Sequence, residues 1–160
     1  IILKMNSLED KDMIRALYRA SEAGVKIDLI IRGICCLIPN QSYSKNITVT
    51  RIVGAYLEHS RVWYFYNEGE ENVYLTSADW MERNLHRRIE VAFPVYSESL
   101  KRQIIDILKI QLNDNVSAVW VDENLNNVFK SNLASQGSKL IRAQEATYEY
   151  LKKSTEHKDR

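Results

Sequence analysis

The sequence predicts one α/β domain with a mixed, mainly β-sheet core flanked by helices. Three observations lead to this class: a strand–helix–strand pattern over residues 1–31, a pair of aromatic-rich strand-like segments in the middle, and two amphipathic helical stretches after them. A length of 160 residues, with 45% apolar and 27% charged residues, is typical of a single globular domain.

The N-terminal unit alternates strand, helix and strand. Residues 1–5 form an apolar stretch typical of a strand, and residues 6–10 supply turn and capping side chains for a helix. Apolar residues recur at helical spacing over 13–20, and Gly24 is expected to end the helix. The nearly continuous apolar run at 25–31 predicts a second strand. A unit of this length implies parallel pairing and a right-handed crossover.

The remaining chain continues with strands and helices. A Glu-Gly-Glu-Glu stretch at 68–71 separates two strand-like segments and predicts a hairpin. The expected elements are strands at 47–52, 61–66, 72–76 and 88–95, a helical turn at 53–58, a helix at 97–112, a strand pair at 116–121 and 126–130, and a final helix at about 138–152.

We expect these elements to form one domain over residues 1–153, followed by a polar tail at 154–160. The chain opens directly on a strand, without a polar lead-in. For this reason we also expect it to be a fragment of a longer chain.

Charge and cysteine usage limit the classes of partner. The chain carries 22 basic and 21 acidic residues, a net charge of +1, whereas nucleic-acid binders normally show a strong basic excess. We therefore expect no nucleic-acid partner. The adjacent Cys35 and Cys36 cannot build a disulfide framework and are predicted to be buried free thiols. No apolar run reaches the roughly 18 residues of a membrane span. We expect a cytoplasmic location and leave peripheral membrane association open.

Two segments with chemical potential flank the predicted hairpin. His59 and Arg61 precede the first hairpin strand, and residues two apart in an extended chain share one face. Ser77 and Asp79 follow the second hairpin strand and are expected to share a face in the same way. This arrangement predicts a phosphate site in which Ser77 offers a hydroxyl and Asp79 orients the imidazole. Each residue taken alone also fits an ordinary structural role.

Further basic and polar residues are expected near the same edge of the sheet. Arg32 ends the second strand, and Lys4 and Asn6 end the first, at the carboxyl edge where α/β sheets bind anions. Arg83 opens a basic cluster that also contains His86, Arg87 and Arg88. This cluster is either a solvated helix start or one wall of an anionic tunnel.

The spacing of His59–Arg61 and Thr76–Trp80 resembles a variant of the phospholipase D superfamily motif. That motif has histidine and lysine two apart, then an aspartate, then Gly-Ser-x-Asn. In this sequence Arg61 stands in place of the lysine, Tyr66 in place of the aspartate and Asp79 in place of the asparagine. The resemblance implies a phospholipase-D-like fold.

A narrower resemblance covers the chain to about residue 152. The sequence is similar to the carboxy-terminal, second phospholipase-D-like domain of long-type polyphosphate kinases. The segments that carry this similarity, in register, are Lys4–Leu8, Gly24–Ile30, Arg32–Leu37, Leu57–Arg61, Ser77–Met81, Arg83–Leu85 and Arg87–Arg88.

This resemblance implies a phosphotransferase. Enzymes of this family transfer the terminal phosphate of ATP to inorganic polyphosphate, reversibly, with magnesium and through a phosphohistidine in the first phospholipase-D-like domain. It further implies that this chain is the second half of the active site and is inactive alone. Its partners are then ATP or ADP, polyphosphate, the preceding domains of the same chain, and further copies in a homo-oligomer.

The site residues implied by the resemblance are His59 and Arg32, which contact the nucleotide phosphates. We add Arg61, Ser77 and Lys4 as phosphate ligands. Asp79, Asn6 and Arg83 are supporting residues. We assign no metal ligand to this chain and expect the magnesium ligands outside it.

The chemistry of these groups agrees with such roles. A guanidinium can hold a phosphate with two charge-assisted hydrogen bonds, and an imidazole can transfer a proton near neutral pH. For His59 we place acid–base work first and nucleophilic attack second. Two alternatives stay open: a phospholipase-D-like phosphodiesterase or nuclease that acts as a dimer, and a non-catalytic module that binds phosphate chains.

Overall fold

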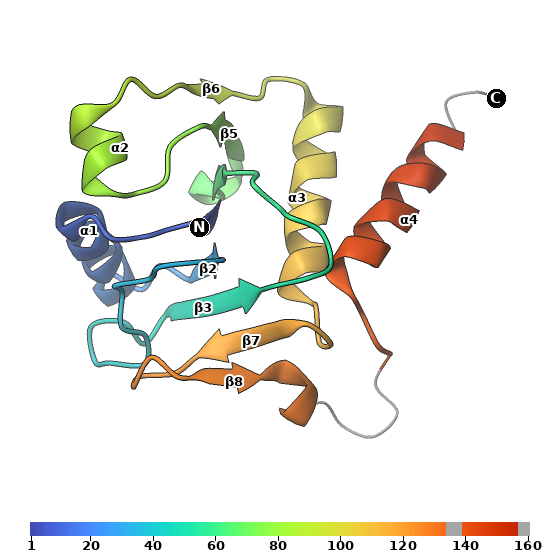
Figure 1. Cartoon of the computed structure of the whole chain (residues 1–160). Coiled ribbons are helices and arrows are strands. Elements are labelled where there is room, and N and C mark those ends of the chain that lie inside the picture. The colour runs from blue at the N-terminus through green and yellow to red at the C-terminus, as the bar shows by residue number, and fades with distance from the viewer. Residues whose placement is uncertain (134–138, 157–160) are drawn as a thin grey trace.

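The computed structural model describes residues 1–133 and 139–156, which fold around one eight-stranded sheet (Figure 1). This confirms the predicted α/β domain with a mixed sheet. The strands are β1 (Ile2–Met5), β2 (Ile27–Ile31), β3 (Ile47–Ile52), β4 (Val62–Phe65), β5 (Asn72–Thr76), β6 (Ala92–Pro94), β7 (Ala118–Val121) and β8 (Asn127–Phe129). The helices are α1 (Lys11–Glu22), α2 (Glu82–Arg87), α3 (Glu98–Leu112) and α4 (Ala143–Glu156), with 3-10 turns η1 (Asn67–Gly69) and η2 (Lys130–Leu133).

The centre of the sheet is parallel and its two flanks are antiparallel. The strand order is β6-β5-β4-β1-β2-β3-β7-β8, in which β1, β2 and β3 run parallel. The predicted strand–helix–strand unit is confirmed by the parallel register of Leu3 with Leu29. β4 pairs antiparallel with β1 on one side, and β7 pairs antiparallel with β3 on the other.

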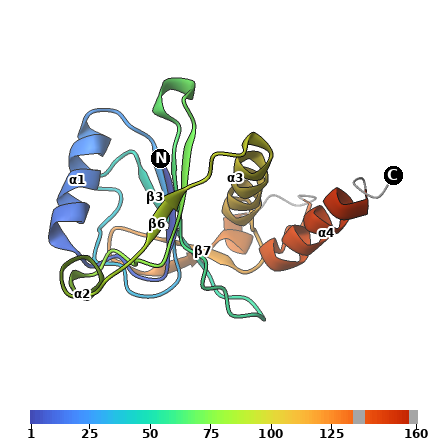
Figure 2. The same ribbon diagram turned by 90° about the horizontal axis from the view of Figure 1, so that it is seen from above.

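Helices cover both faces of the sheet. Figure 2 shows α1 and α2 on one face, α3 and α4 on the other. Because strand side chains alternate, Leu3 packs under α1 while its neighbour Ile2 faces α3. The two hydrophobic clusters that result bury both faces of β1 and β2, which explains their nearly continuous apolar sequences.

The ends of α1 follow the predicted capping pattern. Asp10 is the N-cap, and its Oδ1 accepts from the Asp12 and Met13 amides at 3.1 and 3.0 Å. Gly24 follows the last turn with φ of +90°, a conformation that a residue with Cβ adopts only at a cost. The predicted start and stop of this helix are therefore confirmed.

Several predicted boundaries were wrong. Residues 53–58 form no helical turn, because Val53, Tyr56 and Leu57 are all exposed and give a helix no face to bury. The strand expected at 88–95 is shortened to β6, since its partner β5 ends at Thr76, which pairs with Ala92.

The C-terminal helix also differs from the prediction. α4 begins at Ala143 and continues to Glu156, past the expected boundary at 153. The division into a domain at 1–153 and a tail at 154–160 stays a prediction, and 157–160 lie outside the described residues. The two cysteines are free but not both buried: Cys35 is half-buried and Cys36 is exposed.

Asp114 fixes the connection between α3, β7 and α4. Its side chain is 1% exposed, and its Oδ1 accepts from the amides of Val116, Ser117 and Ala118 at 2.7–2.9 Å. Its Oδ2 accepts from the amide of Ala143, at the start of α4, at 2.7 Å. One buried carboxylate therefore satisfies four backbone donors from two elements.

We predict that Asp114→Ala lowers the free energy of unfolding by about 3 kcal/mol, because it leaves buried amides without acceptors. Denaturant titration measures this loss. Asp122→Ala is the matched control, since Asp122 also accepts from turn amides, but at the surface. Its loss of stability should be clearly smaller, because water can replace the lost acceptor. Equal losses in the two variants would contradict this account.

Candidate functional site

Four segments meet at one edge of the sheet. β1 and β2 end there, since they are parallel, and β4 begins there because Val62 pairs with Lys4. β5 ends at the same edge because Leu75 pairs with Val62. The topology therefore brings His59 and Asp79 to the edge that also holds Lys4 and Arg32.

Arg61 and Asp79 form a bidentate ion pair at this edge. Arg61 Nε donates to Asp79 Oδ1 and Arg61 Nη2 donates to Oδ2, both at 3.0 Å, and the two side chains are 12% and 6% exposed. The amide of Asn6 also donates to Oδ1 at 2.7 Å. Burial alone would raise the pKa of Asp79. The hydrogen bonds from Arg61 and from the Asn6 amide outweigh it and hold the pKa below its usual value.

His59 is exposed and contacts Arg61, not Asp79. Arg61 Nη1 donates to the His59 carbonyl at 3.1 Å, and Arg61 Nη2 lies 3.4 Å from His59 Nε2. The expectation that Asp79 orients the imidazole directly was wrong, because Arg61 occupies both carboxylate oxygens. The contact between Arg61 Nη2 and His59 Nε2 confirms that these two side chains lie on one side.

Lys4 and Arg32 line a small pocket beside this ion pair, together with Asn6, Glu58 and Ser60. Lys4 is only 7% exposed and pairs with Glu58. Burial lowers the pKa of Lys4, and the nearby charge of Arg32 adds to this, against the opposite effect of Glu58. Among the described residues, Arg32 has no carboxylate partner. Glu58 and Ser60 flank His59 in the chain, so the backbone of His59 passes beside this pocket, but the imidazole is not among the side chains that line it.

Ser77 does not share a face with Asp79. Asp79 is buried, whereas Ser77 is exposed and donates its hydroxyl to Glu90 while accepting from the amide of Val91 at 3.0 Å. The prediction failed because β5 ends at Thr76, and two-residue alternation holds only within an extended strand. Hydrogen bonds from Ser77 and from a neighbouring asparagine lower the pKa of Glu90.

The basic cluster of Arg83, His86, Arg87 and Arg88 lies on α2 and directly after it. No bounds for this helix were predicted from the sequence. His86 Nε2 lies 3.1 Å from Asp10 Oδ2, and Arg87 pairs with an acidic residue of its own helix. Arg83 and Arg88 are exposed. Both earlier interpretations of the cluster, a solvated helix and a tunnel wall, stay predictions.

The acidic side chains at this edge do not suit a magnesium ion. Glu58 and Asp79 already pair with Lys4 and Arg61. Within residues 1–133 and 139–156, no three His, Cys, Asp or Glu side chains gather to hold a metal.

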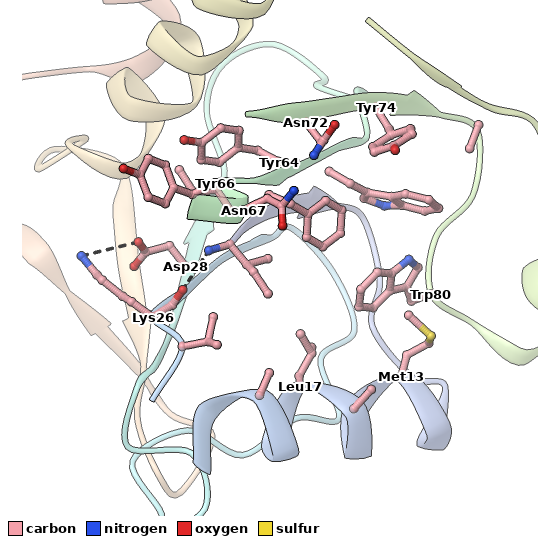
Figure 3. Close-up of a pocket in the computed structure, with 18 of the residues that line it drawn as sticks. Met13, Leu17, Lys26, Asp28, Tyr64, Tyr66, Asn67, Asn72, Tyr74 and Trp80 are labelled. Carbon is pink, nitrogen blue, oxygen red and sulfur yellow. Dashed lines mark hydrogen bonds and ion pairs between the residues drawn. The ribbon is translucent and has the colours of Figure 1, made fainter. Parts of the chain in front are cut away.

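An open apolar groove of about 1280 Å³ lies between α1 and the β4–β5 hairpin. Figure 3 shows Met13 and Leu17 of α1 below Trp80 and the hairpin residues. Its one basic lining side chain, Lys26, lies 3.7 Å from Asp28. It shares no lining residue with the pocket of Lys4 and Arg32.

The family model described as polyphosphate kinase C-terminal domain 2 matches residues 1–144. The chain belongs to this family. A polyphosphate kinase of Campylobacter jejuni subsp. doylei is 50% identical over 153 residues, which are 96% of this chain and 21% of that protein. The Halalkalibacterium halodurans polyphosphate kinase is 56% identical over 119 residues, 74% of this chain and 17% of that protein. This polyphosphate kinase domain therefore spans about a fifth of the relatives' length.

Solved structures agree with this membership. The crystal structure of polyphosphate kinase from Porphyromonas gingivalis matches with a TM-score of 0.94 and 57% identity, over 98% of this chain and 24% of that chain. NucT from Helicobacter pylori matches with a TM-score of 0.51 and 16% identity, over 69% of this chain and 77% of that chain. A phospholipase D family member, Nuc from Salmonella typhimurium, matches at 0.51 and 15% identity, over 70% and 78%. The predicted phospholipase-D-like fold is confirmed.

Within the described part of this polyphosphate kinase domain, no helix is long and apolar enough to cross a membrane.

We predict that Asp79→Asn lowers the free energy of unfolding at pH 7 by about 3 kcal/mol, because it leaves Arg61 buried without a counter-charge. The folded-state pKa of Asp79 is lowered, so its contribution is complete above the unfolded value of about 3.9 and is lost as pH falls through the folded value. The difference between wild type and variant should therefore shrink below about pH 4.

Urea titrations at pH 7 and pH 3 measure this difference. Asp12→Asn is the control, since the Asp12–Arg15 pair is exposed and its loss should cost at most about 1 kcal/mol. A pH-independent difference for Asp79→Asn would contradict the depressed pKa.

Proposed function

We propose that this domain forms the nucleotide-phosphate side of the active site of a polyphosphate kinase, which transfers the terminal phosphate of ATP reversibly to inorganic polyphosphate. One observation carries the proposal: Arg32 lies beside the buried Lys4, and of these two cations only Lys4 has a carboxylate partner among the described residues. The positive charge of Arg32, which has no counter-charge among the described residues, favours an anionic ligand at this pocket.

Arg32 and Lys4 serve as the phosphate-binding pair. Phosphoryl transfer needs mainly positioning and charge neutralisation, which a guanidinium supplies with two parallel donors. Lys4 acts as a fixed point charge, because its contact with Glu58 and its burial restrict the ammonium group. Together they hold the phosphate oxygens of ATP or ADP in the pocket that Glu58 and Ser60, the chain neighbours of His59, also line.

His59 serves as the proton-transfer group. A guanidinium can only donate, so in the contact with Arg61 Nη2 the acceptor is the ring nitrogen His59 Nε2. When both ring nitrogens are protonated, the imidazolium can give one proton to a phosphate oxygen as charge develops on it, and the ring that remains is the neutral imidazole. Nucleophilic attack by His59 stays the second interpretation.

Arg61 and Asp79 mainly hold the imidazole of His59 in position. Arg61 uses three of its nitrogens on Asp79 and His59, so a role in orienting the imidazole fits better than the direct phosphate contact expected from the sequence. The Ser77 hydroxyl, which donates to Glu90, can reach a phosphate only by leaving that partner.

The domain supplies only part of the active site. We propose that the phosphorylated histidine and the magnesium ligands come from other domains of a longer cytoplasmic chain, which assembles as a homo-oligomer. The chain alone is then inactive.

We predict that His59→Ala in the full-length protein lowers ATP-dependent polyphosphate synthesis by at least about 100-fold, because the proton-transfer group is lost. The thermal unfolding midpoint should stay near that of wild type, since the side chain is exposed. Phosphoenzyme formed from labelled ATP should persist, and its disappearance would favour His59 as the nucleophile. Wild-type synthesis in the variant would remove His59 from the mechanism. Hydrolysis of phosphodiesters without polyphosphate synthesis would support the nuclease alternative.

We predict that Arg32→Ala raises the KM for ATP about 10- to 100-fold, which corresponds to about 1.5–3 kcal/mol for a charge-assisted hydrogen bond. Steady-state kinetics of the full-length protein measure this change. Arg15→Ala removes an exposed arginine of α1 and should leave the KM unchanged. An unchanged KM in Arg32→Ala would exclude Arg32 from the phosphate site.

A further inference from the structure

The side chain of Gln144, in the first turn of α4, binds the loop that leads to His59. Gln144 Oε1 accepts from the amide of Tyr56 at 3.0 Å, and Gln144 Nε2 donates to the carbonyl of Tyr56 at 2.7 Å. The same Nε2 donates to Glu58 Oε1 at 3.1 Å. We call these three hydrogen bonds the Gln144 clamp. They connect positions 86 and 88 residues apart.

The loop has little else to hold its shape. Residues 53–60 contain no helix or strand, and the side chains of Tyr56 and Leu57 are 76% and 80% exposed. Apolar burial therefore contributes little to ordering it, although fixing each residue costs about 1–2 kcal/mol of backbone entropy. The polar contacts that the described residues give this loop are the Gln144 clamp, the contacts of Glu58 with Lys4 and with Gln111 Nε2, the latter at 2.8 Å, and the two contacts of Arg61 with His59.

Gly54 provides the space that the clamp needs. A Cβ built on Gly54 would lie 2.4 Å from Gln144 Oε1 and 2.5 Å from Gln144 Cδ. Gly54 is not among the glycines with positive φ, so its backbone conformation alone does not exclude alanine. The contact that keeps this position free of a side chain is therefore Gln144 itself.

The start of α4 is attached to the connection between α3 and β7. The carboxylate of Asp114 accepts from the amide of Ala143, and Asn115 Oδ1 accepts from the amide of Ile141 at 2.7 Å. Farther along, Tyr150 Oη donates to Asp106 of α3 at 2.9 Å. Figures 1 and 2 show α4 beside α3 and projecting from the body of the domain. Gln144 thus extends from a well-anchored helix start to an exposed loop.

We propose that Gln144 is a positioning residue for His59. Gln144 fixes the backbone of Tyr56 and the carboxylate of Glu58. The first contact determines the position of the loop that carries His59, and the second determines the position of the carboxylate that pairs with Lys4. Glu58 and Gly54 support the same arrangement. Glu58 contacts both Gln144 and Lys4 and so connects the clamp to the phosphate pocket, and Gly54 leaves room for the Gln144 carboxamide. This proposal rests on the proposed function, in which His59 transfers a proton.

Gln144→Met tests the clamp in the full-length protein. Methionine keeps the length and the apolar stem of the side chain but removes all three hydrogen bonds. We expect kcat for ATP-dependent polyphosphate synthesis to fall about tenfold, since a misplacement of about 1 Å can cost up to about 100-fold. The KM for ATP should change less than kcat, because Lys4 keeps its contact with Glu58 and no described residue of the loop hydrogen-bonds the Arg32 side chain. Glu149→Ala, at an exposed site on the same helix, should keep the wild-type kcat.

A double-mutant cycle separates the clamp from a general effect on folding. Gly54→Ala alone should lower kcat about as much as Gln144→Met, because the added methyl group displaces the carboxamide. In a Gln144→Ala background the same glycine substitution should lower kcat less than about twofold further, since the atoms it would strike are absent. A Gly54→Ala effect of equal size with and without Gln144 would overturn the proposal.

His59→Ala in the same assays distinguishes this inference from the proposed function. If His59→Ala loses synthesis while Gln144→Met and Gly54→Ala keep the wild-type kcat, the clamp has no positioning role and the proposed function stands. If His59→Ala retains the wild-type rate, the proposed function fails, and the positioning role of Gln144 fails with it.

Discussion

Arg61 and Asp79 meet in a buried bidentate ion pair where β1 and β5 end and β4 begins, and the geometry of the site follows from that pair. Asp79 comes from the turn after β5, and its Oδ1 also accepts from the amide of Asn6 after β1. Two buried charges are costly to desolvate, and the cost is offset only when their hydrogen bonds are complete. In this pair they are, because guanidinium, carboxylate and amide face one another at 2.7–3.0 Å.

Of the three cations Lys4, Arg32 and Arg61, two have a carboxylate partner among the described residues and one has none, and this difference determines the chemistry of the site. Arg61 is neutralised by Asp79 and Lys4 by Glu58, so neither needs an external anion to be stable when buried. Arg32 stands next to Lys4, and the described residues give it no such partner. The net charge of the chain is only +1, so the positive charge at the pocket arises from placement and not from composition. A phosphate would supply the missing counter-charge.

The sequence was sufficient to predict the fold and the edge of the sheet at which polar residues gather. Periodicity identified β1, α1 and β2, because each buries a regular set of apolar side chains. It failed at 53–58 and at Ser77, where the chain is irregular and neither helical nor strand periodicity applies. The direct contact expected between Asp79 and His59 was also wrong, since sequence spacing cannot show that Arg61 lies between them.

The loop before His59 shows why such contacts escape a reading of sequence. Its shape depends on Gln144, which lies 88 residues from Tyr56, on an element whose own position depends on Asp114 and Asn115. A glutamine in the first turn of a helix is ordinary, and a glycine in a loop is ordinary, so neither carries a local signal. Their connection appears only when a Cβ at Gly54 is seen to meet the carboxamide. The imidazole of His59 is exposed at the surface. Its position nevertheless depends on two sets of contacts, those of Arg61 at the edge of the sheet and those of Gln144 on α4.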